Sequence, residues 1–148
     1  MTPEIVVGGA FAAAGAVALG HGFVNLSRAV DSEQWPLASG EVLESVVATE
    51  WSDGKMYYPA VRYRYSVGGK SYEAERVRFG GPLKASWRSS AEAVVARYQK
   101  GRQVRVRYSP SHPELAVLEP GASWYIWFIL LGGALFIGIG ITKVLAIL

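Results

Sequence analysis

Two long apolar runs without charge lie near the ends of the chain, in residues 5–24 and 124–142. Runs of about 18 or more predominantly apolar residues are long enough to cross a bilayer as helices. Apart from Glu4, Arg28 and Lys143, every charged residue lies between residues 31 and 121. The pattern therefore predicts two membrane-spanning helices on either side of one soluble domain.

This contrast also sets the expected boundaries. They are residues 1–28 for the first transmembrane helix, 29–121 for the soluble domain and 122–148 for the second transmembrane helix. A cleaved signal peptide is the alternative for the first run, but no Lys or Arg precedes it, and signal peptides have a basic amino-terminal region. A retained helix is the better interpretation.

Strands are predicted in the soluble domain by apolar and polar residues that alternate with a period of two. The clearest case is residues 57–67, where tyrosines and valines alternate with arginines. The predicted strands are residues 40–51, 57–67, 71–80, 103–108 and 114–120. Asp53-Gly54 and residues 68–70 are typical turn sequences. Pro59 is expected at a strand start or on a sheet edge, and a change of phase near Glu75 predicts a bulge.

A short helix is predicted at about residues 89–100, between the third and fourth strands. Ser89 and Glu92 have the spacing of a capping box, and Gly101 follows where a helix-ending glycine belongs. The order is therefore β-β-β-α-β-β. This order favours a small five-stranded antiparallel β-barrel, OB-like or SH3-like, flanked by two transmembrane helices. An open antiparallel meander with a helix is the alternative.

Several segments together resemble the bacterial DUF3592 family of membrane proteins, whose function is unknown. They are "WPLASGEVLES", "YYPAVRYRYSVGGKSYEAERVRFGG" and "ARYQKGRQVRVRYSPSHPELAVLEPG". The motif consists of Tyr63, Tyr65, Gly69, Tyr98, Gly101, Val104, Val106, Tyr108, Pro110, Pro113, Leu118 and Pro120. The family often has an acidic residue where this chain has Ser109. The resemblance implies the architecture and supplies no catalytic residues.

Arginines on the predicted strands are the most distinctive polar feature. They are Arg62, Arg64, Arg76, Arg78, Arg105 and Arg107. If the first two pairs are cross-strand neighbours, they form a basic face for a partner, an anionic lipid headgroup or another acidic ligand. Glu73 and Glu75 would partly neutralise it, and a merely solvated face is the plain alternative. Nucleic acid is disfavoured, because the tyrosines that alternate with the arginines should face the core.

The two histidines are weak candidates for chemistry. His112 lies in a proline-bracketed loop without a second His, Cys or Asp to orient it, so a structural connector is the better interpretation. His21 lies near the end of the first apolar run, and the second run offers no matching haem ligand. No cofactor and no metal is therefore expected.

The apolar runs carry patterns of their own. Small residues recur every four positions, a spacing that lets helices approach closely. They are Gly8, Ala12, Ala16 and Gly20 in the first run, and Ala134 and Gly138 in the second. They would serve either packing of the two helices together or docking into an oligomer. Trp124, Tyr125 and Trp127 have the composition of a membrane-interface anchor.

Composition excludes some chemistry. There is no cysteine, so disulfides and thiolate catalysis are ruled out, and the net charge of +3 is mild. No catalytic motif is present, and we expect a protein that is not an enzyme. The expected role is a multi-pass protein of the bacterial inner (cytoplasmic) membrane. It would act as an accessory subunit or interaction scaffold, as a homo-oligomer or within a larger complex. Arg28 and the domain's arginines favour a cytoplasmic domain, while Lys143 argues the reverse.

Overall fold

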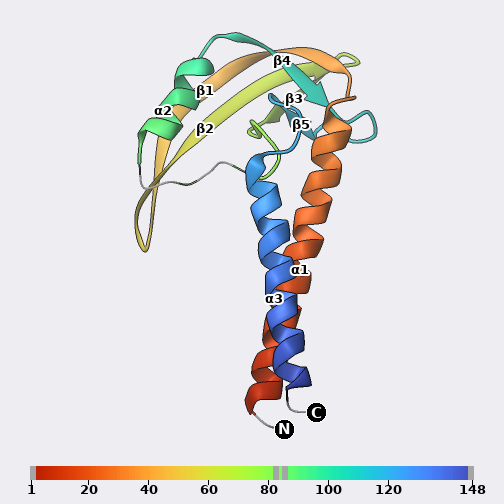
Figure 1. Cartoon of the computed structure of the whole chain (residues 1–148). Helices are drawn as coiled ribbons and strands as arrows, with labels where there is room; N and C mark the ends of the chain where they lie inside the picture. Colours follow the sequence, from red (N-terminus) through yellow and green to blue (C-terminus); the bar gives the residue numbers. More distant parts are fainter. Residues whose placement is uncertain (1–2, 82–83, 85–86, 147–148) are drawn as a thin grey trace. The chain divides into compact units, whose positions relative to one another are not determined.

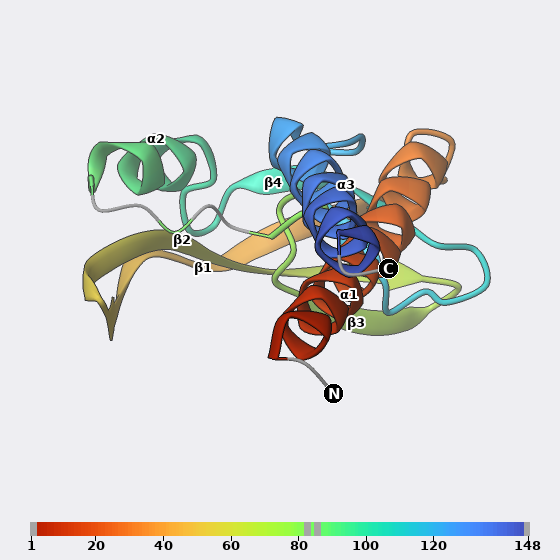
Figure 2. The ribbon, with the colours of Figure 1, turned by 60° about the horizontal axis from the view of Figure 1, so that its bottom comes forward.

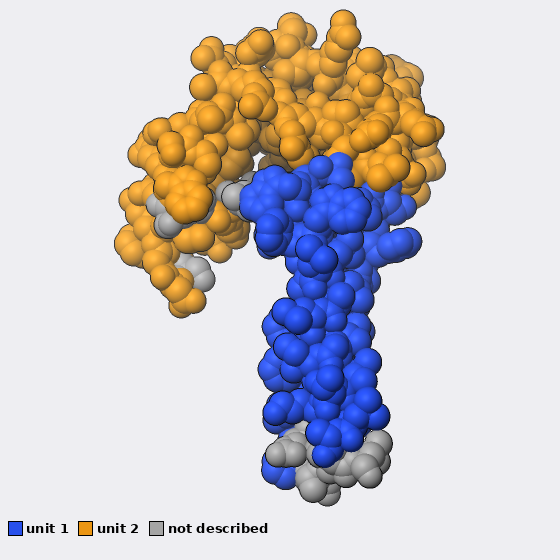
Figure 3. All heavy atoms as spheres, viewed as in Figure 1, with its two compact units in different colours: residues 1–28, 122–148 blue, residues 29–121 orange. Residues whose placement is uncertain are grey.

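The computed structural model describes residues 3–81, 84 and 87–146. It has two units (Figure 3): residues 29–121, and the terminal segments 1–28 and 122–148 together. The elements of the described residues, labelled in Figure 1, are α1 (Pro3–Ser32), β1 (Leu37–Ser52), β2 (Gly54–Val67), β3 (Lys70–Ala74), α2 (Ser89–Arg97), β4 (Gln103–Tyr108), β5 (Ala116–Val117) and α3 (Trp124–Leu145).

The helices α1 and α3 are long and apolar enough to cross a membrane, which suggests membrane association. They lie side by side in Figures 1 and 2. Glycines make the close approach possible: a Cβ on Gly15 would lie 2.7 Å from the carbonyl oxygen of Gly133, and one on Gly140 would lie 2.7 Å from that of Gly8. Phe11 and Phe136 stack with their ring centroids 5.5 Å apart.

The glycines in contact recur every seven residues: Gly8, Gly15 and Gly22 on α1, Gly133 and Gly140 on α3. A step of seven residues keeps to one helix face, drifting by about 20°.

The predicted four-residue ridge drifts by about 40° at each step. The structure accordingly brings Gly8 and Ala12 to α3, whereas a Cβ on Gly20 or on Gly138 would meet no atom within 4 Å. Ala16 and Ala134 are exposed. Packing of this outer set against another chain stays a prediction.

The soluble unit is built on a five-stranded antiparallel sheet in the order β3-β2-β1-β4-β5. Among the described residues the sheet is open, so the expected barrel is not confirmed. Closure would need β3 to pair with β5, and these strands have five and two residues. The backbone N–H of Glu119 donates to the carbonyl of Val77 at 2.7 Å, which joins the segments that follow the two edge strands.

Several predicted boundaries needed correction. The strand predicted over residues 71–80 ends at Ala74, so no bulge interrupts it; the register shift lies in β1, between Val42 and Glu44. The strand predicted over residues 114–120 is reduced to β5.

The predicted end signals of α2 also differ. The cap before α2 is Arg88, without a side-chain hydrogen bond, so the Ser89 capping box is wrong. Gly101, with φ of +82°, lies in a turn beyond the helix end, where the N–H of Arg102 donates to the carbonyl of Gln99.

The core lies on one face of the sheet, and α2 packs on β2 and β1 (Figure 2). Val61, Tyr63 and Tyr65 of β2 are buried, as their alternation predicted. The hydroxyl of Tyr63 donates to the carbonyl of Arg76 at 2.7 Å, and that of Tyr65 donates to the carbonyl of Pro113. Burial raises the pKa of Tyr65 to about 12, so it remains a neutral donor.

We predict that Gly15→Ala destabilises the helix pair by about 1–3 kcal/mol, because its methyl group would overlap the backbone of Gly133. Gly20→Ala is the matched control, since open space surrounds that position. Thermal unfolding of the full chain in detergent measures both. Equal melting temperatures for the two variants would contradict this packing.

Candidate functional site: the paired arginines of the strand face

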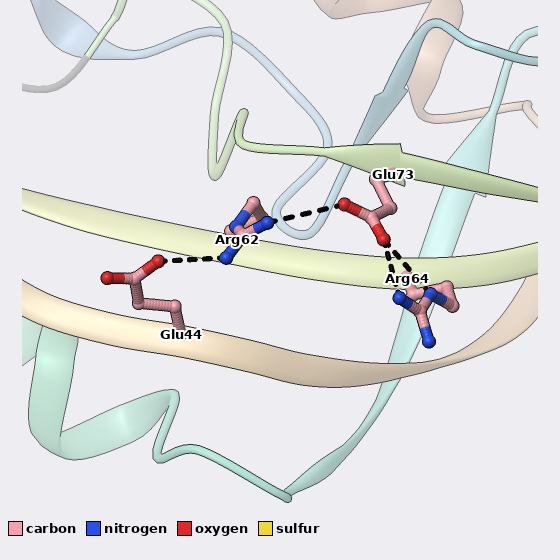
Figure 4. Close-up of polar contacts among 4 residues, drawn as sticks. All are labelled: Glu44, Arg62, Arg64 and Glu73. Carbon is pink, nitrogen blue, oxygen red and sulfur yellow. Dashed lines mark hydrogen bonds and ion pairs between the residues drawn. The ribbon is translucent and has the colours of Figure 1, made fainter.

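Charged side chains form a connected chain across β1, β2 and β3 (Figure 4). Arg62 Nη2 lies 3.1 Å from Glu44 Oε2, and its Nη1 lies 3.5 Å from Glu73 Oε2. The other oxygen of Glu73 accepts from Arg64 Nη2 at 2.7 Å and from Nε at 3.1 Å. The two arginines therefore share one carboxylate.

Strand register produces this arrangement. Glu44 is the register partner of Arg62, and Glu41 and Glu73 flank Arg64 on its two sides. Side chains directly opposite each other on antiparallel strands lie within contact distance. The face around Arg62 and Arg64 therefore carries alternating positive and negative side chains. The sequence had indicated that Glu73 would partly neutralise this basic face.

The electrostatics of this cluster favour the paired state. The hydrogen bond from Arg64 is the main cause that holds the pKa of Glu73 below its usual value, and the charges of both arginines add to it. The side chains are 40–55% exposed, so each pair contributes little to stability. The cluster sets the charge of the face more than the stability of the fold.

The other predicted arginines lie elsewhere. Because β3 ends at Ala74, Arg76 and Arg78 are not strand neighbours of the first pair, so the condition for one basic face formed by both pairs is not met. The guanidinium of Arg76 lies 5.0 Å from the ring centroid of Phe79. Arg107 Nη1 donates to the carbonyls of Glu33 and Trp35, both at 2.8 Å. Arg105 makes no ion pair within the part of the chain that the structure describes.

A second charged cluster, not predicted from the sequence, centres on Glu119. Its carboxylate accepts from Arg78, from Arg97 Nη1 at 2.5 Å and from the hydroxyl of Tyr98 at 2.9 Å. The Glu119 side chain is 18% exposed. Arg97 and Tyr98 come from the end of α2, whereas Arg78 comes from the loop after β3. No local spacing could have indicated this, because the partners are distant in sequence.

The pKa of Glu119 reflects two opposed causes. Burial is the largest single influence and raises it. The hydrogen bonds from Tyr98, Arg97 and Arg78, together with the charge of Arg78, outweigh burial, so the pKa lies below its ordinary value of 4.5. Glu119 is therefore held as a carboxylate that ties α2 to the end of the chain's last strand.

The proline-bracketed loop is a braced connector. The N–H of Ser109 donates to the carbonyl of Leu115, and that of Leu115 donates to the carbonyl of His112. His112 Nδ1 lies 3.1 Å from Ser111 Oγ, which lies 3.2 Å from Ser109 Oγ. The His112 ring itself is exposed. Among the described residues, no three His, Asp or Glu side chains are grouped as metal ligands.

The remaining predicted residues lie on the terminal helices. Trp124, Tyr125 and Trp127 open α3 and are 59%, 39% and 55% exposed. Their role as an interface anchor stays a prediction. His21 accepts a hydrogen bond at its backbone carbonyl from the Asn25 side chain, one turn on.

A comparison with protein families matches residues 38–123 to DUF3592, a domain of unknown function. The chain belongs to the DUF3592 family. A search of curated proteins finds no match. The DUF3592 match covers both charged clusters and all of the sheet except Leu37, and the helices α1 and α3 lie outside it.

The DUF3592 motif residues mainly serve the fold. Tyr63, Tyr65, Val106 and Leu118 belong to the buried core, and Tyr98, Val104 and Tyr108 pack against it. Gly69 and Gly101 have positive φ values of 81° and 82°, which only glycine adopts readily. The motif therefore indicates a shared architecture and does not identify a catalytic residue.

We predict that Glu119→Gln lowers the free energy of unfolding at neutral pH by about 1.5–3 kcal/mol, because charge-assisted hydrogen bonds are lost. A carboxyl group with a lowered folded-state pKa stabilises the fold above its ordinary pKa. That contribution disappears as the pH falls through the lowered value.

The difference between wild type and Glu119→Gln should therefore be constant near neutrality and decrease as the pH falls through the lowered pKa of Glu119. Denaturant unfolding across a pH series measures it. Glu75→Gln, at an exposed position, is the control and should change little. A deficit that persists undiminished at the lowest pH would argue against the proposed ion pairing.

Proposed function

We propose that this DUF3592 protein is a non-enzymatic integral membrane protein that acts as an accessory subunit or interaction scaffold. In this proposal α1 and α3 cross the bacterial cytoplasmic membrane, and the soluble unit faces the cytoplasm and binds other polypeptides. The chain works as a homo-oligomer or as a subunit of a larger membrane complex.

One observation carries the proposal. Large apolar side chains are exposed on the soluble unit, whereas Arg62 and Arg64 on the strand face are already paired within the chain. Leu37, Val46, Trp51 and Trp87 are 51%, 46%, 76% and 63% exposed. Exposed tryptophans are frequent energetic centres of protein interfaces. The unit therefore offers more to a protein partner than to a small charged ligand.

Apolar side chains of the terminal helices add support. Val17, Phe23, Leu131 and Leu135 are 73%, 67%, 67% and 64% exposed. Such surfaces on helices of this length favour contact with lipid or with other membrane helices.

We predict that the full chain, extracted gently from its own membranes, migrates at a native mass well above one chain and carries companion polypeptides. Trp87→Ala should weaken their retention without lowering thermal stability, because that side chain is mostly exposed. Lys100→Ala, also exposed and near the other end of α2, is the control. Native mass spectrometry, with identification of the companion polypeptides, measures both the native mass and their retention. A strictly solitary monomer would refute the proposal.

The alternative function, binding of an anionic lipid headgroup or another acidic ligand by the strand arginines, has less support. Glu44 and Glu73 already occupy Arg62 and Arg64. We expect the full chain in zwitterionic nanodiscs to show no saturable binding of inositol hexakisphosphate by calorimetry. If it does bind, and Arg62→Gln with Arg64→Gln abolishes the binding, the alternative is the better function.

A further inference from the structure

The far part of the β1–β2 hairpin is a two-stranded ribbon whose outer edges lack a strand partner among the described residues. On one side, the pairing of β4 with β1 ends at Glu41; on the other, the pairing of β3 with β2 begins at Tyr63. Unpaired strand edges present N–H and C=O groups that can pair with another strand. The ribbon, residues 44–62, therefore has two candidate edges for strand addition.

Register determines which backbone groups of β1 point outward. The N–H of Val42 donates to the carbonyl of Arg102, and its carbonyl accepts from the N–H of Gly101, so the backbone of Val42 faces away from β2. After the register shift, Glu44 pairs with Arg62. Bonded and non-bonded pairs alternate along antiparallel strands. The backbone of Val42 faces outward, so its neighbour Glu41 forms a bonded pair with Arg64, and Glu44 with Arg62 is the next bonded pair after the shift. The outward backbone groups beyond the shift therefore belong to Ser45, Val47, Thr49 and Trp51.

The two edges of the ribbon differ. Pro59 is the register partner of Val47, so its nitrogen faces outward from β2, where it offers no N–H. The β1 edge has no proline, and no bulge interrupts it after Glu44. Outside its pairing with β2, the backbone of residues 45–51 makes no hydrogen bond to any other described residue. Within the part of the chain that the structure describes, the β2 edge is thus blocked at Pro59, and the β1 edge is open.

We propose that the β1 edge, residues 45–51, pairs antiparallel with the same edge of a second copy of this chain, about a two-fold axis at Ala48. The inference rests on the proposed role as an interaction protein and names one partner and its contact.

Self-complementarity favours a second copy. About an axis at Ala48, Val47 of one copy lies opposite Thr49 of the other, and Val46 lies opposite Glu50. Pairs of β-branched residues across strands are favourable, and no like charges meet. A register centred on Val47 would instead place Glu44 opposite Glu50. The two-fold contact is also closed, so it satisfies both edges at once without forming a fibre.

The chain has no cysteine, so a single introduced cysteine reports this contact without interference. Ala48 bonds to β2, and across the proposed axis it would form a non-bonded pair with Cα atoms about 4.5 Å apart, within the range of a disulfide. We expect Ala48→Cys in the full chain, oxidised in its native membrane, to form a disulfide-linked dimer. The matched control is Ala60→Cys on β2, which is similarly half-buried and should remain monomeric.

A second variant tests the edge itself. The N–H of Thr49 is not used in pairing with β2, so Thr49→Pro should block the outer edge while leaving the hairpin paired. Added to Ala48→Cys, it should lower the yield of dimer at least about tenfold. Thr49→Ser is its control and should preserve the yield. Thermal unfolding of each variant confirms that the soluble unit is intact.

Three outcomes overturn the inference: no dimer from Ala48→Cys, equal dimer from Ala60→Cys, or a cross-link from Ala48→Cys to a different polypeptide. The comparison of the two cysteine variants holds even if Thr49→Pro does not fold. Native companions without an Ala48→Cys dimer would leave the proposed function standing and remove this inference. A dimer without companions would confirm the edge contact and count against the accessory-subunit role.

Discussion

The extra residue in β1 at Leu43 is the constraint on which the soluble unit depends. Before it, Val42 points into the core and turns its backbone toward Gly101 and Arg102. After it, the strand continues in register with β2 for the rest of the hairpin. One strand thereby joins β4 at its beginning and β2 along its length. The register shift also decides which backbone groups of β1 face away from the sheet.

Charge in this molecule is largely balanced over short distances. Glu73 is shared by two arginines of one strand, whereas Glu119 gathers groups from α2 and from the loop after β3. The first arrangement follows from strand register and lies at the surface. In the second, the carboxylate of Glu119 is mostly shielded from water, and it links parts of the fold that the sheet does not connect. The two carboxylates therefore have different physical roles despite similar partners.

Sequence patterns predicted what depends on near neighbours. The alternation in β2, the turn glycines and the long apolar helices are all visible locally, and Pro59 lies on an edge as expected. Properties that depend on distant pairing were not visible. The lengths of β3 and β5 determine three such properties. These are closure of the sheet, the position of Arg76 relative to Arg62, and the convergence of side chains on Glu119. Likewise, the contact between α1 and α3 uses glycines spaced seven residues apart. The sequence shows a four-residue spacing of small residues just as clearly, so it did not indicate which set makes the contact.

The hydrogen bonds of Gly121 have a further consequence. Its N–H donates to the carbonyl of Ala29 at 3.2 Å and to the Ser32 hydroxyl at 3.1 Å. The first and last residues of the soluble unit are therefore held together by hydrogen bonds at Gly121. A unit whose ends meet in this way is suited to insertion, because it can be placed in the loop of a host without separating the flanking segments. The unit has the form of a cassette that evolution or an engineer can transplant between helical hairpins.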